Sequence, residues 1–127
     1  MKIPMISIVD DDKSVREATK GLVRSLGYVA VAYASAEEFL QSNRVDETRC
    51  LITDMRMPGL SGVELQNLLI EQGRRIPMIF ITAFIVESIR KQAMNAGAVG
   101  FLSKPFDEQC LIDHLNTAVT GPESIEE

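Results

Sequence analysis

Short apolar runs alternate with stretches of helical periodicity along the chain. The first run, residues 5–9, is almost wholly apolar and lacks the polar alternation of a half-exposed strand, which predicts a strand buried on both faces. Residues 14–26 follow with apolar side chains every three or four positions, and Gly27 is a typical helix end. The chain therefore begins with one strand followed by one amphipathic helix.

The same unit of a strand and a helix occurs five times. The predicted strands are residues 5–9, 29–33, 50–54, 77–82 and 100–104. The predicted helices are residues 14–26, a helix opening at Ser35, and residues 61–73, 87–96 and 107–119. Two helix starts have the spacing of a capping box, Ser35 with Glu38 and Ser61 with Glu64. This alternation predicts an α/β fold with a doubly wound, five-stranded parallel sheet of flavodoxin-like order 2-1-3-4-5 and helices on both faces.

The composition agrees with a single folded unit. The length of 127 residues is usual for one domain, and 46% hydrophobic with 24% charged residues is an ordinary globular balance. No low-complexity linker interrupts the repeats. We expect one domain over residues 1–120, followed by an acidic tail at residues 121–127.

The charge balance limits the partners of this domain. With a net charge of −5 the chain lacks the basic face that binds phosphate backbones, so we expect no direct binding of nucleic acid. The first apolar run is too short for a membrane span or a signal peptide and ends in carboxylates. Cys50 and Cys110 lack metal-binding spacing, and we expect two buried thiols in a reducing compartment. These features predict a cytoplasmic protein without a membrane segment.

Polar side chains stand where the predicted strands end, and in open parallel sheets ligands bind outside these carboxyl ends. The side chains at these ends are Asp10, Asp11, Asp54, Thr82 and Lys104. The first and third strands are neighbours in the predicted order, so Asp54 should lie beside Asp10 and Asp11. Clustered carboxylate oxygens suit Mg²⁺.

The three consecutive carboxylates at residues 10–12 need an explanation, because two like charges about 4 Å apart repel by about 4 kcal/mol at an effective dielectric of 20. We expect Asp12 to cap the following helix or to support the ligands from behind, and not to bind the metal itself, since aspartate is a preferred N-cap residue. Asp10 and Asp11 would then be available to a cation. A carboxylate such as Asp54, placed beside a divalent cation and facing Lys104, is a chemically competent acceptor for a phosphoryl group.

Four segments together resemble the receiver domain of two-component response regulators over almost the full chain: "VDDD", "TDMRMPGLSGVEL", Thr82 and "GFLSKPF". The segment after the third strand is most like receivers of the nitrogen-fixation-regulator type, which are attached to helix-turn-helix transcription factors. The resemblance implies that Asp54 is the phosphoacceptor. It also implies that Asp10, Asp11 and Asp54 hold Mg²⁺ (or Mn²⁺), with help from the backbone carbonyl of Arg56.

The resemblance extends to the residues that respond to phosphorylation. Thr82 and Lys104 would contact the phosphoryl group, and Phe101 would be the switching aromatic residue. Lys104 and Pro105 would be joined by a cis peptide bond. The implied partners are a sensor histidine kinase, a second copy of the chain after phosphorylation, and a helix-turn-helix output domain in a longer chain. Such a domain is no conventional enzyme but catalyses its own phosphorylation and dephosphorylation.

The loop after the fourth predicted strand departs from the family pattern, because Phe84, Ile85 and Val86 stand where glycine and polar residues are usual. These residues either pack onto the next helix or form an apolar surface for a partner or a second copy.

The Arg56 side chain lies next to the predicted acceptor and either reaches a phosphoryl group or covers the site. The sequence leaves both questions open.

Two other functions compete with this interpretation. An aspartyl phosphatase of the haloacid dehalogenase type would use Asp10 as its nucleophile and Asp12 as its acid, and labelling would then place phosphate on Asp10 instead of Asp54. A flavin-binding electron carrier shares the predicted fold. However, its phosphate loop needs hydroxyl and amide donors where this chain has carboxylates.

Overall fold

The computed structural model describes residues 3–120. The five strands are β1 Met5–Val9, β2 Val29–Tyr33, β3 Thr48–Asp54, β4 Met78–Thr82 and β5 Gly100–Ser103. They form one parallel sheet in the order β2-β1-β3-β4-β5, which confirms the predicted flavodoxin-like α/β fold. The predicted acidic tail at residues 121–127 lies outside the described residues.

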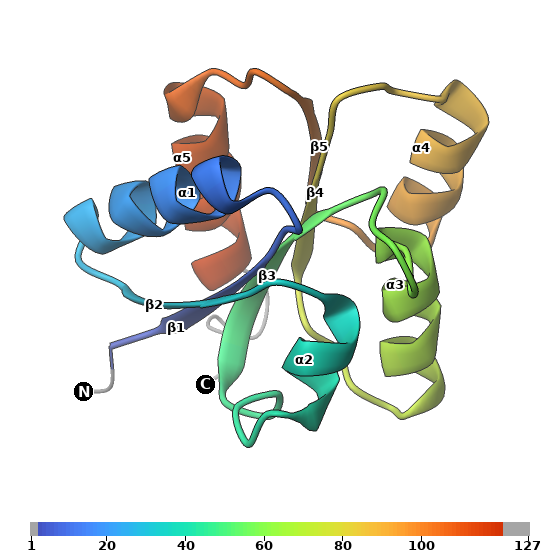
Figure 1. Cartoon of the computed structure of the whole chain (residues 1–127), viewed down its shortest axis with the longest axis horizontal. Coiled ribbons are helices and arrows are strands. Elements are labelled where there is room, and N and C mark those ends of the chain that lie inside the picture. Colours follow the sequence, from blue (N-terminus) through green and yellow to red (C-terminus); the bar gives the residue numbers. More distant parts are fainter. Residues whose placement is uncertain (1–2, 121–127) are drawn as a thin grey trace.

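Helices cover both faces of the sheet, as Figure 1 shows. The helices are α1 Lys13–Ser25, α2 Ala36–Gln41, α3 Gly62–Glu71, α4 Glu87–Asn95 and α5 Glu108–Val119. Helices α1 and α5 lie on one face, and α2, α3 and α4 lie on the other (Figure 1). No helix in the described part of the chain is long and apolar enough to cross a bilayer.

Strands β1 and β4 are almost wholly apolar because both of their faces are buried. In β4, Ile79 and Ile81 belong to the core beneath α1 and α5, whereas Met78 and Phe80 belong to the core beneath the other three helices. Successive side chains of a strand point to opposite faces, so a central strand between two helix layers needs apolar residues at every position. The expectation that the first strand, residues 5–9, is buried on both faces is confirmed, whereas the edge strands β2 and β5 are only partly buried.

Side-chain caps start most of the helices. Asp12 accepts hydrogen bonds from the backbone N–H of Ser14 and of Val15, at 2.9 and 3.3 Å, which confirms its predicted capping role. Asp107 caps α5 in the same way by accepting from Gln109 N–H at 3.0 Å. Each cap satisfies a backbone donor that the first helical turn leaves without a partner.

Only one of the two predicted capping boxes is complete. At α3, Ser61 accepts from Glu64 N–H, and the Glu64 carboxylate accepts from Ser61 N–H in return. At α2, Ser35 accepts from Glu38 N–H, but the Glu38 carboxylate accepts from Ala34 N–H, one residue before the cap. The reciprocal hydrogen bond from the Ser35 N–H to the Glu38 carboxylate is therefore replaced by one from the preceding residue.

The prediction of two buried thiols is wrong for one of them. Cys50 is buried in β3, and burial raises the pKa of its thiol to about 12. Cys110 is exposed on α5, because the buried face of that helix is set by Leu111, Leu115 and Ala118. A residue directly before Leu111 is turned by about 100° from this face.

Candidate functional site

An acidic cluster lies where β1 and β3 end. These strands are neighbours, and Val9 pairs with Thr53, so the following residues Asp10 and Asp54 lie side by side. One carboxylate oxygen from each of Asp10, Asp11 and Asp54 lies within 4.8 Å of the others. The topology thus brings together the carboxylates that the sequence places more than forty residues apart.

Lys104 supplies a positive charge to this cluster from the end of β5. Its ammonium group lies 3.2 Å from Asp10 Oδ2 and 3.2 Å from Asp54 Oδ2. The Lys104 backbone N–H donates to the carbonyl of Thr82 at 2.7 Å, and the following peptide bond to Pro105 is cis. The loop after β5 thus holds the ammonium between two carboxylates.

The electrostatic balance of the cluster is unfavourable for the charge on Asp54. Burial and the neighbouring Asp10 carboxylate raise the pKa of Asp54, and Lys104 and the backbone N–H of Arg56 counteract this only in part. For Lys104, burial lowers the pKa, but Asp10 and Asp54 outweigh it and raise the pKa above its usual value. Lys104 therefore remains a cation at neutral pH, in a site with more negative than positive charges.

The backbone around Asp10 is held by groups that the sequence did not identify. Arg16, from the first turn of α1, donates to the Asp10 carbonyl at 2.8 Å. The Asp12 backbone N–H donates to Asp10 Oδ1 at 2.9 Å, and the Asp10 N–H donates to the Tyr33 carbonyl. No sequence rule predicts this hydrogen bond from the Arg16 side chain to a backbone carbonyl six residues earlier. The bond nevertheless fixes the turn between β1 and α1.

Close packing fixes the backbone of Asp54. A Cβ atom added at Gly62 would lie 2.6 Å from the Asp54 carbonyl oxygen, 3.1 Å from Met55 Cα and 3.2 Å from the Phe80 ring. The Gly62 N–H donates to the Met55 carbonyl at 2.9 Å. The start of α3 can approach the end of β3 this closely only because residue 62 has no side chain.

Thr82 and Phe101 lie near the acidic cluster but do not join it. The buried Thr82 hydroxyl donates to the Phe84 carbonyl at 3.1 Å, and it accepts from the Phe84 N–H at 3.2 Å. Phe101, in β5, is half-buried and packs against Phe80, with ring centroids 5.7 Å apart. Thr82 is thus bonded to the backbone of the loop that follows it.

The β4–α4 loop presents an apolar surface beside the cluster. The side chains of Phe84, Ile85 and Val86 are 72%, 42% and 38% exposed, so the loop does not bury them on α4. The Arg56 guanidinium carbon lies 5.9 Å from the centroid of the Phe84 ring. In this structure the Arg56 side chain packs over an exposed ring, in the range of a cation–π contact.

The donor set of the cluster fits a divalent cation. Three carboxylates share one ammonium group among the described residues, which leaves net negative charge on hard oxygen ligands. Asp11 is exposed, whereas Asp10 and Asp54 are buried, so the cluster is open to solvent on one side. A divalent cation would neutralise the negative charge that remains when Lys104 is counted.

Comparison with known families gives a clear match. Residues 6–116 match the family model of the response regulator receiver domain. Nodulation protein W of Bradyrhizobium diazoefficiens is 46% identical over 114 residues, which are 90% of this chain and 50% of that protein. Transcriptional regulatory protein FixJ of Azorhizobium caulinodans is 36% identical over 107 residues, 84% of this chain and 51% of that protein. The chain spans about half the length of the curated relatives it matches.

Solved structures agree with this result. Response regulator StyR superposes with a TM-score of 0.85 at 44% identity, over 94% of this chain and 60% of that one. The crystal structure of FixJ-N superposes with a TM-score of 0.82 at 36% identity, over 94% of this chain and 95% of that one.

Proposed function

The chain belongs to the response regulator receiver domain family and is a phosphoacceptor domain of a two-component response regulator, and we propose that it takes the phosphoryl group onto Asp54. The observation that carries this proposal is the position of the Lys104 ammonium, 3.2 Å from Asp54 and 3.2 Å from Asp10. A cation in this place can neutralise the oxygens of an incoming phosphoryl group beside the Asp54 carboxylate.

In the proposed reaction one oxygen of the Asp54 carboxylate forms a bond to phosphorus. The bond between phosphorus and a histidine nitrogen of the donor breaks, and its electron pair remains on that nitrogen. Lys104 supports the step by balancing charge on the phosphoryl oxygens, since phosphoryl transfer depends mainly on positioning and electrostatics. Burial of Asp54 limits the orientations of its carboxylate, which Arg56 N–H also holds at 3.3 Å. Hydrolysis of the acyl phosphate would return the free carboxylate, so the chain would catalyse both half-reactions.

We further propose that Asp10, Asp11 and Asp54 hold Mg²⁺ (or Mn²⁺), together with the backbone carbonyl of Arg56. When bound, the ion supplies positive charge to the phosphoryl oxygens. The three carboxylates provide hard ligands within 4.8 Å of one another. Arg16 has a supporting role, because it keeps the backbone at Asp10 in the conformation that directs this carboxylate to the cluster.

The response to phosphorylation would begin at Thr82. In the described structure its hydroxyl bonds to the Phe84 backbone, so it must leave this partner to reach a phosphoryl group on Asp54. Phe101 packs beside Phe80 on the neighbouring strand and can turn inward when Thr82 moves. This would change the surface formed by α4, β5 and α5.

The proposed partners follow from the family. A sensor histidine kinase would donate the phosphoryl group, and a helix-turn-helix output domain would follow in a longer chain, since the relatives are about twice as long. The exposed residues Phe84, Ile85 and Val86 are a candidate contact surface for a second copy after phosphorylation. We propose a cytoplasmic location and no direct nucleic-acid contact by this domain, whose net charge is −5.

Intact-mass spectrometry tests the acceptor directly. The parent chain is incubated with acetyl phosphate and Mg²⁺, beside the variants Asp54→Asn and Asp10→Asn. We expect the parent to gain the mass of one phosphoryl group and Asp54→Asn to gain none. Peptide mapping of the labelled parent should place the group on Asp54. Label on Asp10, or equal labelling of Asp54→Asn, would contradict the proposal and favour the phosphatase alternative.

A further inference from the structure

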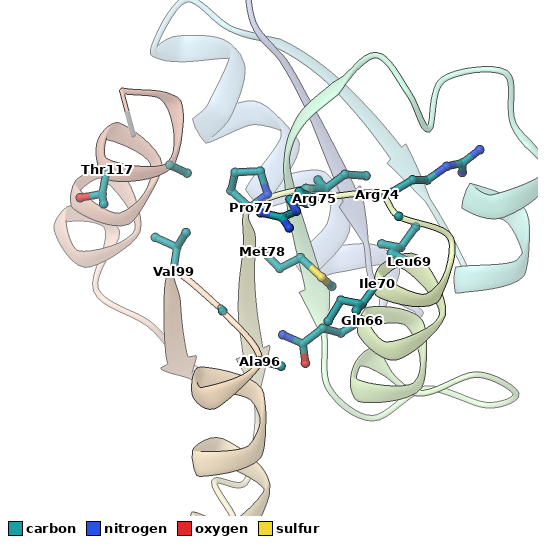
Figure 2. Close-up of a pocket in the computed structure, with 14 residues that line it drawn as sticks. Gln66, Leu69, Ile70, Arg74, Arg75, Pro77, Met78, Ala96, Val99 and Thr117 are labelled. Carbon is teal, nitrogen blue, oxygen red and sulfur yellow. The ribbon is translucent and has the colours of Figure 1, made fainter. Parts of the chain in front are cut away.

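A hollow of about 870 Å³ lies at the amino-terminal ends of β4 and β5, at the opposite end of the sheet from the acidic cluster. The ends of α3, α4 and α5 surround it, and Figure 2 shows the residues that line it. Its walls include Leu69, Ile70, Met78 and Val99. Its size is within the range of small-molecule pockets, which is about 300–1,000 Å³, and such pockets combine apolar walls with a few polar groups.

Gln66 provides a buried polar group in this hollow. Its side chain comes from α3, is 3% exposed, and its Nε2 donates to the carbonyl of Ala93 at 3.1 Å. A carbonyl can only accept, so this bond fixes which end of the amide is the oxygen. Within residues 3–120 no donor reaches Gln66 Oε1, although this atom is buried. A buried acceptor without a donor is unfavourable, and a ligand O–H or N–H would satisfy it.

Arg75 provides a positive charge at the edge of the same hollow. Neighbouring Arg74 pairs with Asp46 at 3.2 Å, and Figure 2 shows its guanidinium directed away from the other lining residues. Arg75 is exposed, is drawn among the lining residues in Figure 2, and forms no ion pair with any residue from Ile3 to Thr120. In a chain with a net charge of −5, this guanidinium is a local site for an anion.

Two glycines lie on the rim of the hollow. Gly73 and Gly97 end α3 and α4 with φ of +77° and +107°, and a Cβ at either position would meet no heavy atom within 4 Å. Ile70 on the wall is 49% exposed, although it is a large apolar side chain. The rim thus admits a molecule whose apolar part covers this wall.

We propose that this hollow is a second binding site, for a small carboxylic acid that has an apolar body and a hydroxyl group. The carboxylate would bind the Arg75 guanidinium. The apolar body would cover Ile70, Met78 and Val99, and the hydroxyl would donate to Gln66 Oε1. This site is independent of the acidic cluster and requires no phosphoryl group.

NMR titration of the isotopically labelled chain with 4-hydroxybenzoate tests the proposal. We expect saturable shifts of the Met78 and Val99 methyl signals and of the Ala96 amide signal below about 10 mM ligand, a range suited to millimolar affinities. Benzoate lacks the hydroxyl and phenol lacks the carboxylate, and each should bind about tenfold more weakly. These analogues use the parent protein, so the result does not depend on the folding of a variant.

Two matched variants separate a built site from general attraction of an anion. Arg75→Ala should weaken binding about tenfold, whereas Arg74→Ala should change it less than twofold, because Arg74 is paired with Asp46 and Arg75 has no ion pair with a described residue. Asp54→Asn should bind as the parent does. The proposal is overturned if no signal saturates, if the shifts map elsewhere, or if both arginine variants lose affinity equally. If benzoate binds as tightly as 4-hydroxybenzoate, then water and not a ligand hydroxyl donates to Gln66 Oε1, and that part of the proposal is wrong.

Discussion

Removal of the Asp54 charge should stabilise the metal-free protein. The Asp54 carboxylate lies within 4.8 Å of oxygens of Asp10 and Asp11 and 3.2 Å from the Lys104 ammonium. At an effective dielectric of 20, unit charges 4.8 Å apart repel by about 3.5 kcal/mol and opposite charges 3.2 Å apart attract by about 5 kcal/mol. Because Asp11 is exposed, solvent reduces its contribution to about 1 kcal/mol. The charge interactions nearly cancel, so the cost of burying the carboxylate decides the sign.

We therefore expect Asp54→Asn to raise the free energy of unfolding by about 1–2 kcal/mol at neutral pH without metal. The gain should depend on pH in a defined direction. The pKa of Asp54 is raised in the folded state, so the parent binds the proton more tightly when folded and loses stability as the pH rises from about 4, the unfolded value. Asp54→Asn does not lose stability in this way. Its stability advantage over the parent should therefore be small near pH 4 and reach its full value above the folded pKa of Asp54.

Urea denaturation followed by circular dichroism measures this difference, in EDTA and in about 10 mM Mg²⁺. Mg²⁺ should stabilise the parent more than the variant and thereby reduce the gain. Asp113→Asn is the control, because it removes an equal charge from the exposed surface of α5 and should change stability by less than about 0.5 kcal/mol. The reasoning is refuted if Asp54→Asn is less stable in EDTA, or if its gain does not grow with pH.

Three further predictions concern other parts of the chain. Thr82→Ala should be phosphorylated within about twofold of the parent but lose the accompanying NMR shifts on α4, β5 and α5, whereas Thr82→Ser should retain them; equal loss of phosphorylation would contradict this division. Iodoacetamide at pH 8 should modify only Cys110 in the native protein and both cysteines in urea, because burial raises the pKa of Cys50 to about 12; native labelling of Cys50 would argue against its burial. Phe84→Ser should reduce self-association of the phosphorylated chain in analytical ultracentrifugation, and unchanged association would exclude Phe84 from the dimer contact.

Patterns of hydrophobic and polar residues were sufficient to predict the sheet order and the meeting of Asp10 with Asp54. A strand buried on both faces and a helix with one apolar face follow from local periodicity, and parallel topology then brings the strand ends together. The helical periodicity of α5 also predicts that Cys110 is exposed, since Leu111 and Leu115 define the buried face. That error came from the residue type, because cysteine is usually buried.

Other features depend on geometry that no short pattern contains. The hydrogen bond from Arg16 to the Asp10 carbonyl depends on the angle between β1 and α1. Which backbone N–H donates to the Glu38 carboxylate, that of Ala34 or that of Ser35, depends on the shape of one turn. The hollow at the amino-terminal ends of β4 and β5 is formed where the ends of three helices meet. Its residues, among them Gln66 and Arg75, are unremarkable in the sequence.

The two hydrogen bonds between the Thr82 hydroxyl and the Phe84 backbone also affect how the domain can evolve. They involve only main-chain atoms of residue 84, so the side chain at this exposed position can change to suit a new binding partner without breaking the hydrogen bonds of the Thr82 hydroxyl. Proline is the exception, because it has no N–H to donate. If Phe84 contacts a partner and Thr82 transmits the signal, as we propose, then substitutions at position 84 would change the partner contact while the hydrogen bonds of Thr82 remain.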